Sequence, residues 1–208
     1  IIDEINRGNL SKIFGELIYG LEYREEEIDL QYKEFNPNEP ELGVLSVPKN
    51  LFVIGTMNTA DRSIILFDAA LRRRFSFIPL FPDYNLLAQW FDIAEKFDED
   101  TFREKLANAT GETKNKILSI LALAKINSAL TRDPSIGREK QIGHTFLLEL
   151  RDSPGNFVKI WKHDIFPLLE EYYFEAPNVI TEMFNNDIFE SQEGIKNFEV
   201  GTLSKALE

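Results

Sequence analysis

Two adjacent acids, Asp3 and Glu4, follow two apolar residues in the first stretch of the chain, IIDEINR. At the C-terminal end of a strand, two neighbouring side chains point to opposite faces. One carboxylate can then hold a hydrated Mg²⁺, which prefers oxygen ligands and keeps several waters. The other can orient or deprotonate a water molecule. A solvated acidic turn explains the pair as well, so its assignment depends on the rest of the chain.

The second candidate is Asn58, in the stretch GTMNTADRS, directly after a short apolar run. If that run is a strand of an open α/β sheet, Asn58 lies at the carboxyl edge, where such sheets bind their ligands. Its amide offers a donor and an acceptor, which suits a γ-phosphate or an attacking water. Asn58, Thr59 or Asp61 could also cap the helix that follows.

The third candidate is the run Arg72, Arg73 and Arg74 in LRRRF, which is unusual in a chain of net charge −12. A guanidinium fork binds phosphate well. Arginines supplied to a neighbour's nucleotide also stabilise the transition state of phosphoryl transfer. A solvated basic helix end facing the helix dipole is the alternative. A fourth feature, His144 in QIGHTF, is a lone histidine for which a structural role is the simpler interpretation.

The elements expected to position these residues alternate between strand and helix. Apolar residues at three- and four-residue spacing predict a helix over residues 10–21, and alternation from Ile28 predicts a hairpin-like insertion with an acidic tip,. The continuous apolar run at residues 51–54 is typical of a strand buried on both faces, as in a parallel sheet. A short helix around residues 64–71 and a strand at 75–80 complete the pattern of an α/β domain,.

After the stretch FPDYN the pattern changes to helices. Three apolar stripes at helical spacing begin at Leu87, Ile117 and Phe157,. The sequence therefore predicts the C-terminal half of an α/β core over residues 1–82 and an all-helical domain over residues 83–208.

Composition excludes several classes of protein. The net charge of −12 disfavours nonspecific binding to nucleic acid by the chain as a whole, because phosphate neutralisation needs clustered Lys and Arg,. Cysteine is absent and the two histidines are far apart, so neither a disulfide framework nor a zinc motif is expected,. With no long apolar run and no signal peptide, we expect a cytoplasmic protein with no membrane partner.

Taken together and in this order, IIDEINR, MNTADRS and ALRRRFSF are far more specific than any of them alone. They resemble the AAA+ ATPase core, and more narrowly the McrB family, the GTP-dependent motor subunit of modification-dependent restriction systems. MNTADRS is the discriminating motif. The resemblance continues through IGHTF and DIFPLLEEYYF to about residue 175. It implies the C-terminal part of a P-loop NTPase core, with a parallel sheet and an inserted hairpin, followed by a helical lid.

The resemblance also assigns roles to residues. Asp3 and Glu4 resemble the Walker B acids, with Asp3 in the Mg²⁺ shell and Glu4 activating water. Asn58 resembles the sensor residue that positions this water against the γ-phosphate of GTP or ATP. Asp61 and Arg62 complete the family signature and resemble part of the catalytic interface between subunits.

The arginine run takes its roles from the same resemblance. Arg73 and Arg74 resemble arginines that act in trans on a neighbouring subunit's nucleotide, with Arg72 as a further candidate. Asp68 is expected to hold the arginine-bearing helix in place. These roles imply identical subunits in a ring, as a hexamer.

Two departures from the family pattern stand out. No GxxxxGK[ST] phosphate loop occurs in the 208 residues,. That loop precedes the Walker B strand in the AAA+ order, so we expect that the chain begins after it and that these residues alone hydrolyse no nucleotide. In the lid, Gln141 stands where the family can carry a basic residue, and Arg138 and Lys140 are nearby substitutes for nucleotide sensing.

The resemblance implies an NTP-hydrolysing ring motor that drives a separate, McrC-like nuclease subunit, with DNA bound through an upstream domain outside this chain. Two other hypotheses stay open. A MoxR-like AAA+ chaperone ATPase shares the Walker B strand, the hairpin and the lid. A non-catalytic oligomerisation or interaction fragment would fit a chain that has the water-activating residues without a phosphate cradle.

Overall fold

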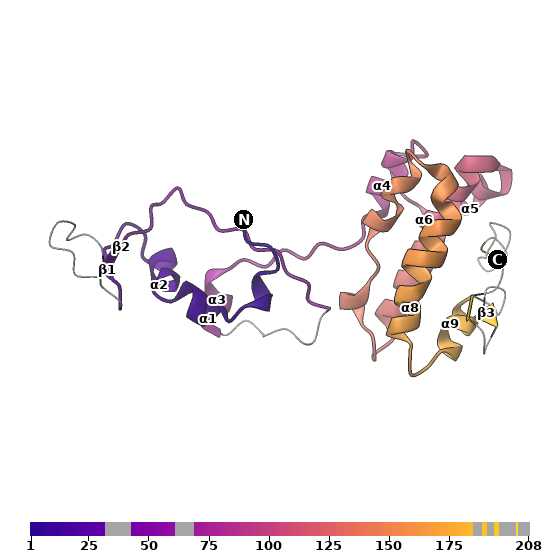
Figure 1. Ribbon diagram of the computed structural model, residues 1–208. Helices are drawn as coiled ribbons and strands as arrows, with labels where there is room; N and C mark the ends of the chain where they lie inside the picture. The colour runs from indigo at the N-terminus through magenta and orange to yellow at the C-terminus, as the bar shows by residue number, and fades with distance from the viewer. Residues whose placement is uncertain (32–42, 61–68, 185–188, 191–193, 196–202, 204–208) are drawn as a thin grey trace. The chain divides into compact units, whose positions relative to one another are not determined.

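The structure is a computed structural model that describes residues 1–31, 43–60, 69–184, 189–190, 194–195 and 203. The chain divides into two compact units, Ile1–Pro79 and Leu80–Glu208 (Figure 1). The domain boundary expected from the sequence, near residue 82, stays a prediction.

The N-terminal unit consists of short elements. Its described helices and strands are η1 (Ile5–Arg7), α1 (Leu10–Phe14), α2 (Leu17–Glu22), β1 (Ile28–Asp29), β2 (Val44–Leu45) and α3 (Ala69–Arg74). The single helix predicted over residues 10–21 is split at Gly15, whose φ of 45° lies in the left-handed region that favours glycine,. The Asn9 side chain caps α1 by accepting a hydrogen bond from the backbone N–H of Lys12 at 3.1 Å,.

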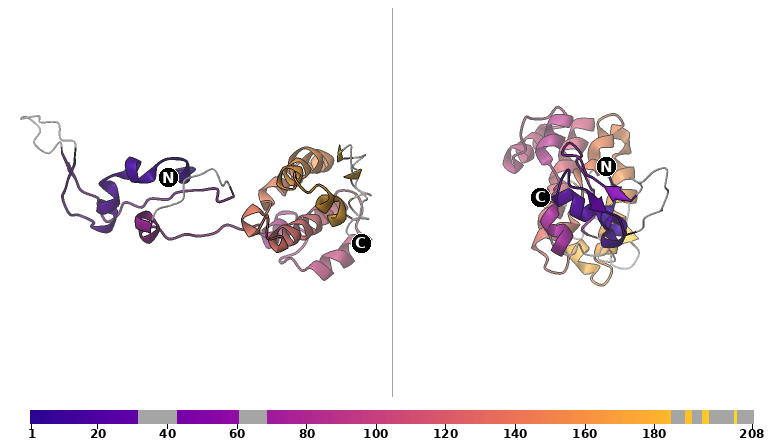
Figure 2. Two further views of the ribbon diagram at one scale, coloured as in Figure 1. Left: turned by 90° about the horizontal axis from the view of Figure 1, so that it is seen from below. Right: turned by 90° about the vertical axis from the view of Figure 1, so that its left-hand side faces the viewer.

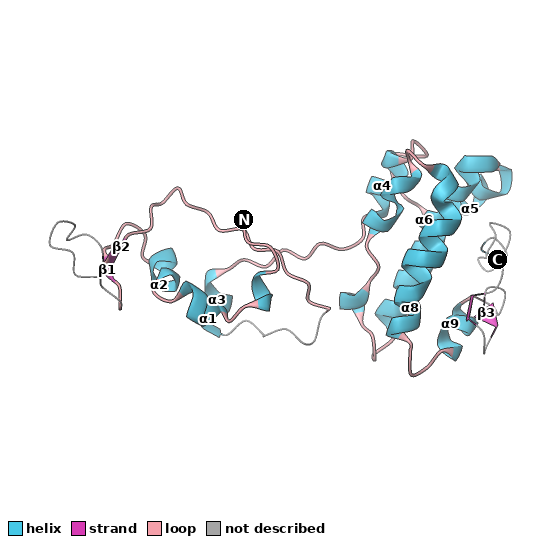
Figure 3. Cartoon of the chain, viewed as in Figure 1, coloured by secondary structure: helices cyan, strands magenta, loops and turns pink. Residues whose placement is uncertain are grey.

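The predicted hairpin is confirmed. Strands β1 and β2 pair antiparallel, with Ile28 opposite Leu45 and Asp29 opposite Val44 (Figure 3). Its predicted acidic tip lies outside the described residues.

The segment after the hairpin differs from the strand predicted at residues 51–54. It is extended, and its pairing with the start of the chain is a single parallel bridge between Ile2 and Gly55. The side chain of Phe52 is 79% exposed, so the prediction of burial on both faces is wrong. A strand buried on both faces needs paired neighbours and a layer on each side. In the described part of this unit, the segment at residues 51–55 has one bridge, to Ile2.

The strand predicted at residues 75–80 is also absent from the structure, which shows irregular chain there. Ile78 is 81% exposed. A segment with strand-forming residues becomes a strand only where a partner strand offers its backbone groups, because β propensity depends on packing against neighbours.

The second unit is mainly helical, as predicted, but it is not all-helical, because one short antiparallel strand pair lies near its C-terminal end. Figures 2 and 3 show its helices. One turn, at Trp161–Ile165, is π-helical. The described elements are α4 (Tyr84–Trp90), α5 (Glu99–Asn108), α6 (Gly111–Arg132), η2 (Arg138–Lys140), η3 (His144–Leu150), η4 (Pro154–Asn156), α7 (Phe157–Ile160), η5 (Trp161–Ile165), α8 (Phe166–Tyr172), α9 (Asn178–Met183), β3 (Phe189–Glu190) and β4 (Gly194–Ile195), of which β3 and β4 pair antiparallel.

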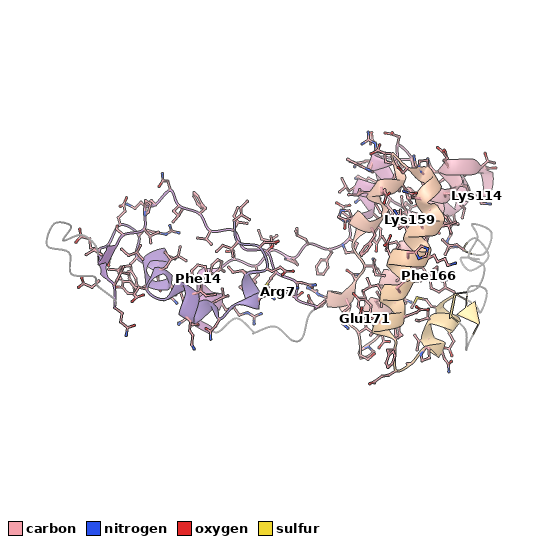
Figure 4. All side chains as sticks on the ribbon, viewed as in Figure 1. Arg7, Phe14, Lys114, Lys159, Phe166 and Glu171 are labelled. Carbon is pink, nitrogen blue, oxygen red and sulfur yellow. The ribbon has the colours of Figure 1, made fainter. Side chains whose placement is uncertain are left out.

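One hydrophobic core holds this helical unit together. The longest helix in the described ranges, α6, packs against α4 and α5. Phe102, Trp161 and Phe166 are fully buried, and Figure 4 labels Phe166. All three apolar stripes of the sequence contribute to this core, with Leu87, Ile117 and Phe157 among its buried residues. None of the helices in the described ranges is long and apolar enough to cross a membrane.

Candidate functional site

The two acids lie in a tight turn that Thr56 holds from the neighbouring segment. The hydroxyl of Thr56 donates a hydrogen bond to Asp3 Oδ1 and accepts one from the backbone N–H of Glu4 at 3.1 Å. Glu4 itself has φ 48°, in the left-handed region, and the N–H of Ile5 donates to the carbonyl oxygen of Thr56 at 2.9 Å. One threonine thus fixes both the carboxylate of Asp3 and the backbone of Glu4.

Both carboxylates are open to solvent. Glu4 forms an ion pair with Arg7 (labelled in Figure 4), with 2.5 Å between Glu4 Oε2 and Arg7 Nε. The Glu4 side chain is 45% exposed, and such exposed pairs contribute little net free energy,. Glu4 can therefore leave Arg7 and bind a water molecule instead at a small cost in free energy.

Asn58 lies beside this acidic turn, as the parallel arrangement of the two segments predicts. Its carbonyl oxygen accepts a hydrogen bond from Asn6 Nδ2 at 3.2 Å. Its side-chain Oδ1 accepts one from the backbone N–H of Ala60 at 3.0 Å. With Oδ1 used in this local turn, the amide nitrogen is the group that can donate to an incoming oxygen.

The arginines form a second cluster at the end of α3. Arg74 is half-buried and forms an ion pair with Glu22 of α2. Glu22, Arg73 and Arg74, with Leu21, line a pocket of about 290 Å³. Arg72 lies over the ring of Phe77, with 5.7 Å from its guanidinium carbon to the ring centroid. The described contacts of these arginines are with α2 and Phe77, whereas those of the acids are with Thr56 and Arg7.

Three predicted site residues, Asp61, Arg62 and Asp68, lie outside the described residues. For the metal, the described ranges contain no cluster of three or more His, Cys, Asp or Glu side chains. Mg²⁺ needs no such cluster, because it is commonly held by one or two carboxylates, waters and substrate phosphates. The exposed carboxylate of Asp3, with the Thr56 hydroxyl beside it, fits that kind of site.

Sequence reasoning missed Thr56 and Asn6. Each acts through a hydrogen bond between segments whose alignment is set by the bridge between Ile2 and Gly55. Both residues belong to the motifs GTMN and DEINR, which could have drawn attention to them. No spacing rule, however, identifies which polar residue of a motif forms a hydrogen bond to the neighbouring segment.

In the helical unit, Asn127 anchors Ile142, which directly follows Gln141 and the basic residues Arg138 and Lys140. Its buried amide donates to the carbonyl oxygen of Ile142 at 2.9 Å and to the hydroxyl of Tyr84 at 3.0 Å, and its Oδ1 accepts from the N–H of Ile142 at 2.7 Å. Burial raises the pKa of Tyr84, so its phenol keeps its proton. This arrangement fixes the loop against α4 and α6.

The residues on either side of Ile142 have partners inside the same unit. His144 Nδ1 accepts a hydrogen bond from the backbone N–H of Asp83 at 3.1 Å, which favours the structural interpretation of His144. Arg138 lies over the ring of Phe81 at 4.8 Å, and Lys140 over the ring of Tyr172 at 4.6 Å. The roles of Arg138 and Lys140 toward a nucleotide stay predictions.

Comparison with known protein families agrees with this arrangement. Residues 1–75 match the AAA domain of the dynein-related subfamily, and residues 119–181 match the McrB alpha-helical lid domain. The chain is therefore an AAA domain followed by an alpha-helical lid.

Two curated relatives narrow the family. The chain is 38% identical over 187 residues to the type IV methyl-directed restriction enzyme EcoKMcrB subunit of Escherichia coli (strain K12), over 85% of this chain and 37% of the relative. It is 33% identical over 87 residues to the type II restriction enzyme BsuMI component YdiS of Bacillus subtilis (strain 168), over 37% of this chain and 25% of that relative. The chain belongs to the McrB family of AAA proteins, and it spans about a third of the length of the first of these relatives.

Proposed function

We propose that the protein containing this chain hydrolyses a nucleoside triphosphate, GTP or ATP, and that Asp3, Glu4 and Asn58 assist the attack of water on the γ-phosphorus. The observation that carries the proposal is the cluster in which Thr56 holds both acids while the Asn58 loop lies against the same turn. The AAA match over residues 1–75 covers every member of this cluster.

Each residue has one chemical task. Asp3 is the carboxylate ligand toward Mg²⁺, which neutralises charge on the β- and γ-phosphates when it is bound. Glu4 leaves Arg7, accepts the proton of the attacking water and so activates that water. Asn58 donates its amide N–H to the water or to the γ-phosphate and aligns the two. The bond from the γ-phosphorus to its bridging oxygen breaks, and the nucleoside diphosphate leaves.

The arginine cluster acts on the nucleotide of a neighbouring subunit. Arg73 and Arg74 supply positive charge to the transition state in trans, with Arg72 beside them, and Asp68 supports their helix. Asp61 and Arg62 contribute to the same interface. A ring of identical subunits, as a hexamer, brings these arginines opposite the Asp3 and Glu4 of the next subunit.

The wider role is that of a motor subunit in a McrBC-like restriction system, and the names of both relatives, a type IV and a type II restriction enzyme, support it. A nuclease subunit would cut DNA that a separate domain binds. The 208 residues contain no GxxxxGK[ST] loop, so we propose that they hydrolyse no nucleotide alone,.

The decisive experiment replaces Glu4 with Gln in the full-length protein and measures GTP and ATP hydrolysis with Mg²⁺, with and without the nuclease subunit. Loss of the general base should lower kcat by roughly 10² to 10⁴ while nucleotide binding is retained. The 208-residue chain alone should show no turnover.

Glu25→Gln is the matched control. Glu25 also has a left-handed backbone, with φ 66°, and forms an exposed ion pair with Lys49 at 2.5 Å. Its replacement should leave hydrolysis unchanged. Hydrolysis that survives Glu4→Gln at the wild-type rate would contradict the proposed role of Glu4.

A further inference from the structure

Asn6 is an unusual residue in the acidic turn because its polar side chain is buried. It is 6% exposed, and it belongs to η1, which directly follows Asp3 and Glu4. Its Nδ2 donates to the carbonyl oxygen of Asn58 at 3.2 Å. Its Oδ1 is also buried and has no hydrogen-bond partner among the residues that the structure describes.

The buried Asn127 of the helical unit shows what a structural asparagine looks like in the same chain. Asn127 uses both ends of its amide, with Nδ2 donating to Ile142 O and Oδ1 accepting from Ile142 N. Asn6 uses only its donor within the described residues, although an unsatisfied buried acceptor is unfavourable. A group kept in this state calls for a reason other than the stability of the fold.

We propose that Asn6 is a positioning residue for nucleotide hydrolysis that holds the Asn58 backbone at a fixed distance from Glu4. Asn58 Oδ1 accepts a hydrogen bond from Ala60 N, which fixes the Asn58 side chain relative to its own backbone. Because Asn6 bonds that backbone, Asn6 also sets the direction in which the Asn58 amide nitrogen points. A displacement of about 1 Å at such a residue can lower a rate by about 10². The inference rests on the proposed hydrolysis and extends it to a residue that acts through the backbone of Asn58.

The test measures kcat and nucleotide affinity for Asn6→Ala in the full-length protein with Mg²⁺ and GTP or ATP. We expect kcat to fall about tenfold to hundredfold, with nucleotide affinity within about twofold of wild type. Asn9→Ala is the control, because Asn9 caps α1 in the next turn of the chain and touches no site residue in its described bonds. It should lower thermal stability and leave kcat unchanged.

A double-mutant cycle with Asn58→Ala separates positioning from general damage. If Asn6 acts through Asn58, adding Asn6→Ala to Asn58→Ala should lower kcat by less than about twofold further. A full multiplication of the two effects, or a wild-type kcat for Asn6→Ala, would overturn the inference. If Asn6→Ala does not fold, Asn6→Leu takes its place, because it nearly keeps the size of the side chain and removes the donor without burying a charge.

Failure of the proposed function gives a different result. In that case the wild-type protein shows no hydrolysis that depends on Glu4, so the Asn6 variants cannot lower it. Glu4-dependent hydrolysis that is indifferent to Asn6 would leave the proposed function standing and remove Asn6 from it.

Discussion

The helical unit, Leu80–Glu208, buries Phe102 and Trp161 completely, whereas the N-terminal unit, Ile1–Pro79, leaves Phe52 79% exposed and Ile78 81% exposed. The difference follows from the kind of element. A helix satisfies its backbone hydrogen bonds internally and needs only a packing face. A strand satisfies its backbone only through neighbours, and the described part of the N-terminal unit offers few of them.

The two units therefore relate to function in different ways. The helical unit has a continuous core and a polar network around Asn127 that is complete within the unit. The N-terminal unit carries the acids and Asn58, but its buried core in the described residues is the small cluster around Ile5, Leu10 and Phe14. We expect changes in the N-terminal unit to affect chemistry first, and changes in the helical unit to affect stability first.

The largest effect that would sharpen this comparison is expected at the arginines of α3. Arg73→Ala and Arg74→Ala in the full-length protein should each lower kcat by roughly 10³, with nucleotide binding retained, because arginines acting in trans serve the transition state. Mixing Arg74→Ala subunits with Glu4→Gln subunits should restore part of the activity, since each kind supplies what the other lacks. Steady-state hydrolysis of the mixture is the measurement.

Arg103→Ala is the control for these arginines. Arg103 lies in α5 of the helical unit and pairs with Glu99 at 3.0 Å on an exposed face. Its loss should leave hydrolysis unchanged. A loss of nucleotide binding in the α3 variants, with no recovery on mixing, would place their arginines in the subunit's own site instead.

The next effect concerns the stability of the two units, measured as the free energy of unfolding. Phe102→Ala in the helical unit should lower the free energy of unfolding by about 3–5 kcal/mol, because it leaves a cavity in a fully buried core,. Phe52→Ala in the N-terminal unit should change it by less than about 0.5 kcal/mol. Both tryptophans of the chain, Trp90 and Trp161, belong to the helical unit, so their fluorescence during denaturation reports its unfolding. Amide hydrogen exchange in the N-terminal unit reports the unfolding of that unit.

Equal destabilisation by Phe102→Ala and Phe52→Ala would break the comparison. It would mean that Phe52 is covered in solution and that the N-terminal unit gains its stability from contacts that the described residues do not show.

The same contrast explains what the sequence could predict. The helical unit was predictable because the apolar stripes beginning at Leu87, Ile117 and Phe157 are local patterns that a helix buries on one face. Burial of Phe52 and a strand at residues 75–80 were wrong predictions, because pairing depends on chain that is distant in sequence. The break at Gly15 was missed, since a helical pattern of apolar residues continues across it.

The candidate site was predictable to a similar degree. The approach of Asn58 to the acids follows from parallel segments that end at one edge, and the structure shows it in the bond between Asn6 and Asn58. The choice of Thr56 and Asn6 as the contacting residues depends on the register of one bridge, which the sequence does not encode locally. The catalytic roles themselves stay predictions.

The smallest expected effect is a pH dependence confined to the helical unit. Burial and the neighbouring carboxylate of Asp133, which accepts a hydrogen bond from the phenol, together raise the pKa of Tyr173 from the ordinary 10.0 to about 12. Below pH 10 the folded and unfolded chains both keep this proton, so its contribution to stability is fully present. Between about pH 10 and 12 the unfolded chain has released the proton and the folded chain has kept it, so the free energy of unfolding falls by at most about 2–3 kcal/mol.

Tyr173→Phe removes this titration and should give a flatter decline of stability over the same pH window. Denaturant unfolding of both chains, followed by tryptophan fluorescence at several pH values from 9 to about 12, measures the difference. Burial also raises the pKa of Tyr84 and Tyr172, so the wild-type curve alone does not isolate Tyr173, whereas the difference between the two chains does. Parallel curves for wild type and Tyr173→Phe would show that Tyr173 is accessible to solvent in the folded state, and that the helical unit is less tightly closed than its buried core indicates.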